Sequence, residues 1–245
     1  MDAYAEDLAF IHDDGFGMIA RGAAATLVEA LAASGIRDGL VVELACGSGI
    51  SSRIVADAGY AVHGFDLAPA MIDLARERVP AGRFEVCSLY DAEIEPCVAV
   101  TAIGEAFNYR FDERAGFERM AEVFERAYAA LAPGGVLLFD VAQPGRVLPR
   151  AEHTVWAGDG WRVSSETIED SVRRRLARRI VSHRAVGGAE RRREELHELA
   201  LYEHESVFAA LRETGFVVRL LASYAGQYHF SAGHGGFLAL RAAER

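Results

Sequence analysis

Lysine is absent from this chain of 245 residues, and all 26 of its basic side chains are arginine. Without lysine, the chain has no phosphate-binding Gly-Lys-Ser/Thr loop, no lysine Schiff base and no Ser-x-x-Lys nucleophile pair. The formal net charge of −10 also lacks the basic excess that a broad nucleic-acid surface needs to displace counterions from phosphates. We therefore expect no nucleic-acid partner.

Cysteine is scarce as well. Cys46, Cys87 and Cys97 lack the paired spacing of a zinc site or a disulfide framework, so we expect reduced, structural thiols. Histidine offers one candidate metal pair, His229 and His234, but carboxylate ligands cannot be placed beside it from the sequence. We predict no metal centre.

Long apolar runs are missing too. No unbroken apolar segment reaches the roughly 18 residues that cross a bilayer, so we expect no membrane contact. The opening stretch MDAYAEDLAF carries acids where a signal peptide carries basic residues, which predicts a cytoplasmic protein.

The first half of the chain alternates short apolar runs with amphipathic stretches. Pro69 favours a helix start, and Pro133-Gly134-Gly135 favours a helix stop. Strands and helices that alternate at this spacing favour right-handed crossovers, so we predict a doubly wound α/β fold with a mainly parallel sheet. The predicted strands are 40–45, 61–66, 83–88, 99–104 and 135–142, and the predicted helices are 2–33, 49–58, 70–79 and 113–132.

The pattern changes after Gly145. Residues 152–203 contain stretches that alternate polar and apolar side chains, and Val186-Gly187-Gly188 is typical of a hairpin turn, which predicts an antiparallel insertion. The insertion carries ten arginines and ten acids, so we interpret its arginine clusters as a solvated surface with cross-strand ion pairs rather than an anion site. After a helix at 204–214, the final strands within 215–226 and 235–242 are too close in sequence for a crossover and should pair antiparallel.

The stretch VVELACGSGI at 41–50 joins the first predicted strand to the first crossover helix. Its small residues Ala45, Gly47 and Gly49 let the backbone approach a ligand closely, and the amides that open the helix favour an anionic group. Asp66 ends the second strand, where a carboxylate can accept both hydroxyls of a ribose. These residues predict a nucleoside-bearing ligand at the strand tips.

Two cofactor classes fit this turn. The dinucleotide pattern Gly-x-Gly-x-x-Gly is imperfect here, because Ser52 stands at its third glycine. Glu43, two residues before the turn, would repel a pyrophosphate but suits the cationic end of S-adenosylmethionine.

On these residues the chain resembles the class I S-adenosylmethionine-dependent methyltransferases. Their first motif, acid-x-Gly-x-Gly-x-Gly, is matched with an alanine in the first glycine position, and their second-strand acid is matched by Asp66. The stretches RFEVCSLYDAEI and AVTAIGEAFNYRF and the closing hairpin extend the resemblance. It implies a Rossmann-like doubly wound seven-stranded sheet with an antiparallel last strand, an antiparallel β cap, and S-adenosyl-L-methionine as cofactor. The implied cofactor contacts are Tyr4, Glu43, Ala45, Cys46, Gly47, Gly49, Asp66, Leu67, Met71, Ser88, Leu89, Asp91, Gly104 and Glu105.

The opening segment and the insertion are similar to those of small-molecule methyltransferases, including enzymes that act on sugars and natural products. The resemblance implies that Tyr4 approaches the methionine carboxylate and that Phe16 walls the site; a core position is the competing interpretation of Phe16. It also implies a single domain over 1–245, with an N-terminal helical lid at 1–35, a cofactor-binding core at 36–145 and 204–245, and a cap at 146–203.

Methyl transfer depends largely on aligning the acceptor and excluding water, and a base is needed only when the acceptor must lose a proton. We expect Phe107 and Tyr109 to face the methylsulfonium, and Glu105 and Asn108 to lie at the mouth unless Asn108 only caps a turn. The candidate catalytic residues are Tyr109, His197 and His229, because histidine is the side chain most often used as a base near neutral pH, whereas His204 is assigned to a helix cap.

We therefore predict an enzyme that transfers a methyl group from S-adenosylmethionine to an oxygen or nitrogen atom of a small organic acceptor, as a monomer or homodimer. The segment after the fourth strand, Gly104 to Phe107, lacks the Asn/Asp-Pro-Pro-aromatic sequence of DNA amino-methylating enzymes. The alternatives are a NAD-dependent oxidoreductase and a non-catalytic protein that binds S-adenosylmethionine.

Overall fold

The computed structural model describes residues 4–147 and 151–242. Its helices are α1 (Glu6–Gly15), α2 (Met18–Ala33), α3 (Ile50–Asp57), α4 (Pro69–Arg78), α5 (Phe117–Ala130) and α6 (His204–Thr214). The strands of the first half are β1 (Leu40–Leu44), β2 (Ala61–Asp66), β3 (Arg83–Val86), β4 (Cys97–Ala102) and β5 (Leu131–Ala142). The later strands are β6 (Ala151–Gly158), β7 (Trp161–Asp170), β8 (Arg175–Val186), β9 (Ala189–Ala200), β10 (Val217–Leu221), β11 (Ser223–Tyr224), β12 (Tyr228–His229) and β13 (His234–Leu240).

The central sheet confirms the predicted α/β topology. Within the described residues it has seven strands in the order β10-β13-β5-β4-β1-β2-β3. The β1 to β5 strands pair parallel, whereas β13 runs antiparallel to both β5 and β10. This arrangement leaves the carboxyl ends of β1, β2 and β4 at one edge, where a doubly wound sheet binds its ligand.

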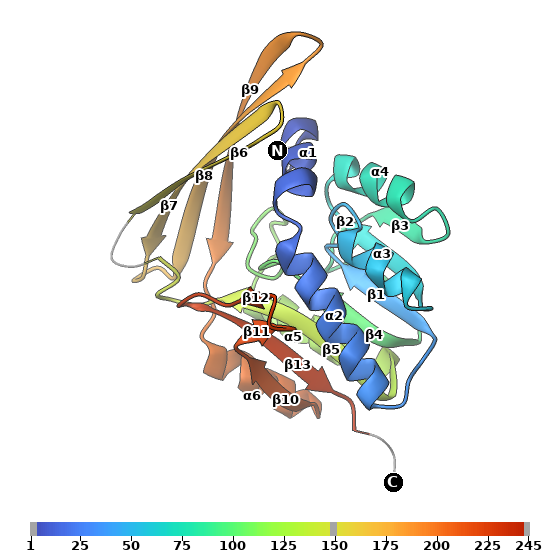
Figure 1. The fold of residues 1–245 in the computed structure, drawn as a ribbon. Coiled ribbons are helices and arrows are strands. Elements are labelled where there is room, and N and C mark those ends of the chain that lie inside the picture. The colour runs from blue at the N-terminus through green and yellow to red at the C-terminus, as the bar shows by residue number, and fades with distance from the viewer. Residues whose placement is uncertain (1–3, 148–150, 243–245) are drawn as a thin grey trace.

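Two layers of helices cover the sheet. The helices α2, α3 and α4 pack on one face through residues such as Leu27, Val55 and Ile72. The helices α5 and α6 pack on the other face through residues such as Phe124 and Leu211. Figure 1 shows α2 crossing the front of the sheet, with α5 and α6 on the far side. Because both faces of the sheet are buried, the sequences of the parallel strands are nearly continuous apolar runs.

The predicted insertion forms a separate four-stranded antiparallel sheet in the order β6-β7-β8-β9. Gly187 and Gly188 make its β8–β9 turn, both with positive φ, as the sequence predicted. In Figure 1 this cap sheet stands away from the central sheet, and α1 lies between the cap and α4. The cap therefore faces the carboxyl edge of the central sheet across the N-terminal helix.

The prediction of one long N-terminal helix over 2–33 is wrong. The segment forms α1 and α2, which are bent by 61° at Phe16–Gly17. No single helix in the described ranges is long and apolar enough to cross a membrane, although the bent pair passes the test of combined length and composition. The bend directs α2 onto the central sheet and α1 toward the cap.

Other boundaries shift by a few residues. The helix predicted at 113–132 begins at Phe117 and ends at Ala130, and β5 begins at Leu131, ahead of Pro133. The strand predicted at 99–104 ends at Ala102, because the backbone turns at Gly104 and Glu105, whose φ values are +83° and +61°. That turn places the following residues over the pocket.

Candidate active site

A pocket opens at the carboxyl ends of the parallel strands, under α1. It brings together most of the predicted cofactor contacts, although they come from separate segments. The predicted residues that line it are Tyr4, Glu43, Ala45, Cys46, Gly47, Asp66, Leu67, Met71, Ser88, Leu89, Gly104 and Tyr109. Its walls contain more carbon than polar atoms, with a few polar groups between them, as is usual for a cofactor site.

The turn after β1 forms the floor of the pocket. Gly47 adopts a φ of +56°, and a Cβ atom at this position would project into open space. Gly49 does not line the pocket; a Cβ atom there would stand 3.0 Å from the Ala75 Cα atom, so this glycine lets α3 pack against α4. Ala45 holds a φ of +57°, a left-handed conformation that glycine adopts more readily.

Asp66 holds this turn in place. Its carboxylate accepts hydrogen bonds from the Gly47 amide and from the Ala68 amide, each at 2.9 Å. Burial raises the pKa of Asp66, and the amide hydrogen bonds oppose that rise. The side chain also lines the pocket, so it joins the turn to the ligand space.

Glu43 is buried beneath the same turn. One of its carboxylate oxygens accepts a hydrogen bond from the Ser52 hydroxyl, and burial raises the pKa of the group. The other oxygen, Oε1, has no hydrogen-bond partner among the residues of the described ranges. A buried acceptor without a partner beside the pocket fits a ligand that carries a positive charge or a donor.

Aromatic side chains form the roof. The Tyr4 and Tyr109 hydroxyls lie 3.1 Å apart, and both residues line the pocket. Burial raises the pKa of each, so both phenols stay protonated at neutral pH and serve as hydrogen-bond donors. His12 and Phe111 complete the roof, and the sequence reasoning missed both. Burial lowers the pKa of His12 to about 4, so its ring is neutral.

Two aromatic residues predicted at the site lie elsewhere. Phe107 is fully buried in the core, with ring centroids 5.7 Å from Phe124 and 5.5 Å from Phe139. Phe16 packs against the cap through Trp156 and Trp161. Both predictions are corrected, because these rings turn into apolar clusters and away from the pocket.

Two acids predicted as cofactor contacts also point away from the pocket. Asp91 lies on the surface, where its carboxylate accepts two hydrogen bonds of 2.6 Å from Arg114. Glu105 is buried but turns toward the cap, between Arg146 and Arg178. Strong cationic partners determine the direction of each carboxylate.

The four histidines considered from the sequence lie in four different settings. His197 is buried on the inner face of the cap, 2.9 Å from the Glu195 Oε2 atom, and its ring centroid lies 5.1 Å from that of Tyr4. His229 is exposed on β12, away from the pocket. The His234 ring bonds Asp140 at 2.8 Å, and no metal-binding group of three or more His, Cys, Asp or Glu side chains occurs in the described ranges. His204 is the first residue of α6, as expected, but its assignment to the cap is wrong, because Glu203 holds the N-cap position and makes no side-chain cap hydrogen bond.

Asn108 joins the core to the cap. Its side-chain amide donates to the carbonyls of Ala142 at 2.8 Å and Ala200 at 2.6 Å, and its Oδ1 atom accepts from the Ala142 amide at 3.0 Å. The residue is fully buried. Both interpretations of Asn108 are therefore wrong: the side chain neither lies at the open mouth nor caps a turn, but bridges the ends of β5 and β9.

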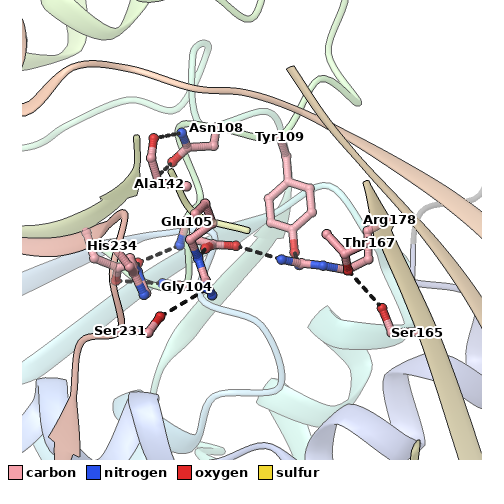
Figure 2. A network of polar contacts seen from close by, with 12 residues as sticks. Gly104, Glu105, Asn108, Tyr109, Ala142, Ser165, Thr167, Arg178, Ser231 and His234 are labelled. Atoms are coloured by element: carbon pink, nitrogen blue, oxygen red, sulfur yellow. Dashed lines mark hydrogen bonds and ion pairs between the residues drawn. The ribbon is translucent and has the colours of Figure 1, made fainter. Parts of the chain in front are cut away.

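A polar network beyond the roof was not predicted. The Glu105 carboxylate accepts from the Arg146 Nε atom at 2.8 Å and from the Arg178 Nη2 atom at 3.2 Å. Arg178 also donates to the Tyr109 hydroxyl at 3.3 Å, as Figure 2 shows. The strand alternation of β8 could have indicated that Arg178 faces inward, but only the packing of the cap on the core brings it to Glu105.

Comparisons with known proteins agree with this geometry. Residues 41–135 match the methyltransferase domain family. The chain is 27% identical over 191 residues to the dTDP-3-amino-3,6-dideoxy-α-D-glucopyranose N,N-dimethyltransferase of Streptomyces fradiae. The aligned residues cover 74% of this chain and 71% of that enzyme. It is 30% identical over 126 residues to the malonyl-[acyl-carrier protein] O-methyltransferase of Serratia marcescens, covering 49% of this chain and 42% of that enzyme.

Solved structures show the same fold. The sugar N-methyltransferase KedS8 from a Streptoalloteichus species superposes with a TM-score of 0.78 at 20% identity, covering 99% of this chain and 95% of that one. An S-adenosylmethionine-dependent methyltransferase from Clostridium acetobutylicum gives a TM-score of 0.78 at 16% identity, covering 96% and 98%.

The fold is a doubly wound α/β sheet with a pocket at its strand tips, where such sheets bind their ligands. The expected resemblance to the class I S-adenosylmethionine-dependent methyltransferases is confirmed: the chain is an S-adenosylmethionine-dependent methyltransferase, and S-adenosyl-L-methionine is its cofactor. The alternatives of a NAD-dependent oxidoreductase and of a non-catalytic binding protein are set aside.

Proposed function

We propose that the enzyme methylates an oxygen or nitrogen atom of a small polar acceptor, which enters the strand-tip pocket beneath the Tyr4–Tyr109 roof. The observation that carries this proposal is a set of polar side chains on the inner face of the cap, buried behind that roof among apolar residues such as Val163 and Ile180. Ser165, Thr167 and Ser182 are buried on the cap, where an apolar sheet face would carry valine or isoleucine. Arg178 lies among them and reaches Tyr109 (Figure 2).

The residues of the pocket fit the cofactor. Glu43 has a buried oxygen without a partner, Asp66 presents a carboxylate, and Gly47 leaves open space for a close backbone approach. We propose that these residues hold the cofactor with Ala45, Cys46, Leu67, Met71, Ser88, Leu89, Gly104 and Tyr4. When bound, S-adenosylmethionine supplies an electrophilic methyl group on a sulfonium centre.

The protein's own part in the reaction is alignment and exclusion of water. The Tyr4 and Tyr109 hydroxyls share one hydrogen bond at the roof, and Tyr109 also accepts one from Arg178. Aromatic side chains at this position favour a cationic methylsulfonium. His197 lies behind Tyr4 and is the predicted base nearest to the roof, so we propose that it receives the proton when the acceptor loses one. His229, on the exposed β12 strand, has no place in this arrangement.

The relatives support a sugar-like acceptor. One curated relative is named for N,N-dimethylation of an amino sugar, and one structural neighbour is described as a sugar N-methyltransferase. A polar cap face and a neutral aromatic roof suit an acceptor of that kind, which carries several hydroxyl or amino groups.

Calorimetric titration with S-adenosylhomocysteine, followed by methyl transfer from labelled S-adenosylmethionine to a panel of amino sugars, hydroxy sugars and carboxylic acids, tests the proposal. We expect saturable binding and transfer confined to the sugar-like acceptors. Transfer only to apolar or aromatic acceptors, or no binding at millimolar S-adenosylhomocysteine, would contradict it.

A further inference from the structure

The turn at Gly104 and Glu105 is held from two sides. Gly104 lines the cofactor pocket, whereas the next side chain, Glu105, turns away from it toward the cap. Glu105 has a φ of +61°, a region that costs an ordinary residue about 1–2 kcal/mol and persists only where neighbouring groups hold it. The neighbours that hold this turn therefore indicate what it does.

The core holds the backbone of the turn through Asp140. This fully buried carboxylate, on β5, accepts from the Gly104 amide at 2.8 Å and from the Glu105 amide at 2.7 Å. Its remaining capacity is used by the Tyr224 hydroxyl at 3.1 Å and the His234 Nε2 atom at 2.8 Å. Four donors from three segments meet on one carboxylate, so the turn has a single position relative to the core.

The cap holds the side chain of the same turn. Arg178, on β8, donates a hydrogen bond of 3.2 Å from its Nη2 atom to the Glu105 carboxylate. It donates another, of 3.3 Å, from its Nη1 atom to the Tyr109 hydroxyl (Figure 2). Tyr109 in turn contacts the Tyr4 hydroxyl over the cofactor pocket. The neighbouring Arg179 faces outward and bonds only Glu194, so the two arginines serve as a matched pair.

Glu105 carries a negative charge between its two arginine partners. Burial favours the neutral acid, but Arg178 and Arg146 outweigh it and lower the pKa of Glu105 to about 2. The carboxylate is therefore ionised at every pH at which the enzyme is expected to work. A permanent negative charge between two arginines keeps Arg178 in one orientation.

We propose that Glu105 and Arg178 form a positioning pair, which couples the placement of the cap to the roof of the cofactor pocket. The Glu105 backbone is fixed to the core by Asp140, and the Glu105 carboxylate orients Arg178. Arg178 in turn positions the Tyr109 hydroxyl, at the place where the methyl group must meet the acceptor. This inference rests on the proposed function for the identity of the reaction, but the coupling itself is a property of the folded chain. It replaces the predicted role of Glu105 as a direct cofactor contact.

Amide hydrogen exchange tests the coupling without an acceptor. Glu105→Gln, Arg178→Met and, as control, Arg179→Met are compared, each with its thermal midpoint recorded to confirm folding. We expect peptides covering 103–109 to exchange about tenfold faster in Glu105→Gln and Arg178→Met, with and without S-adenosylhomocysteine, and at the wild-type rate in Arg179→Met. Equal exchange in Arg178→Met and Arg179→Met would overturn the proposal.

Tyr109→Phe is a milder variant that removes only the hydroxyl at the end of the chain of contacts. Combined with Arg178→Met, it should add little to the faster exchange of 103–109, because both changes break the same link. Fully additive effects would count against the link.

Binding and turnover separate positioning from contact. Affinity for S-adenosylhomocysteine should stay within about twofold in Glu105→Gln, while kcat toward an accepted sugar falls about tenfold. A loss of affinity above about tenfold would instead make Glu105 a cofactor contact and overturn the inference. Wild-type protein that binds no S-adenosylhomocysteine would defeat the proposed function, while the exchange comparison would still decide the coupling.

Discussion

The two sides of the proposed methyl-transfer site, a cofactor side and an acceptor side, are built differently. The cofactor side uses residues from short segments at the ends of consecutive strands, such as Glu43, Gly47 and Asp66. The acceptor side joins residues far apart in the sequence, such as Glu105 and Arg178, which only the packing of the cap brings together. Strand order determines the first side, whereas the docking of one sheet against another determines the second.

The electrostatics differ in the same way. On the cofactor side Glu43 and Asp66 are buried without a basic partner, and burial raises the pKa of each. On the acceptor side Glu105 is buried between two arginines, and its pKa falls to about 2. The first side is therefore prepared for a cation from outside, and the second is already neutralised within the protein.

The largest expected effect tests the cofactor side. Asp66→Ala removes the acceptor of the Gly47 and Ala68 amides and the carboxylate that lines the pocket. Affinity for S-adenosylhomocysteine should fall by about 3 kcal/mol, the scale of losing charge-assisted hydrogen bonds. Calorimetry measures the change, with Asp91→Ala as the control because that acid is exposed and outside the pocket. Equal effects of the two variants would remove our placement of the ribose.

The next prediction concerns the joint between core and cap. Asn108→Ala deletes three buried hydrogen bonds and leaves the Ala142 and Ala200 backbone groups without their partner. We expect the free energy of unfolding to fall by about 3 kcal/mol, as measured by urea denaturation. Asn108→Asp retains the acceptor but not the donors, so it should recover little of the loss; recovery of most of it would show that the donors matter less than the structure indicates.

The third prediction tests the acceptor side through the pH dependence of the free energy of unfolding. Because the folded pKa of Glu105 lies below its ordinary value of 4.5, its ion pairs stabilise the fold fully above pH 4.5 and are lost as the pH falls toward 2. Glu105→Gln should lower the free energy of unfolding by about 3 kcal/mol at pH 7, and the difference from wild type should shrink between pH 4.5 and 3. Denaturation at these pH values measures it. A difference that does not change with pH would mean that the charge of Glu105 contributes nothing.

The smallest expected effect lies in the glycine turn. Ala45→Gly relieves a φ of +57° and should stabilise the protein by about 0.5 kcal/mol, since the strain removed slightly exceeds the entropy that glycine adds to the unfolded chain. Thermal denaturation detects the shift, with Ala25→Gly in the middle of α2 as a control that should destabilise. A less stable Ala45→Gly variant would show that the turn is not strained.

The sequence predicted the central fold well and placed most of the proposed cofactor contacts around one pocket. The central strands, the crossover helices and the β8–β9 turn agree with the structure to within a few residues, and twelve of the predicted site residues line one pocket. Periodicity and turn chemistry are local signals, and the carboxyl ends of neighbouring parallel strands always meet at one edge. The long N-terminal helix was wrong because the bend at Phe16–Gly17 depends on what α1 and α2 each pack against.

Alternation places Arg178 and Arg179 on opposite faces of β8, and the sequence by itself determined that much. It also determined the strand-tip pocket, because each of its segments is defined by neighbours along the chain. Only the tertiary structure decided which cap face is buried, that Phe107 enters the core, and that His197 stands behind Tyr4. The reason is physical: these choices depend on how two separately formed sheets pack, and that free energy comes from contacts between residues distant in sequence.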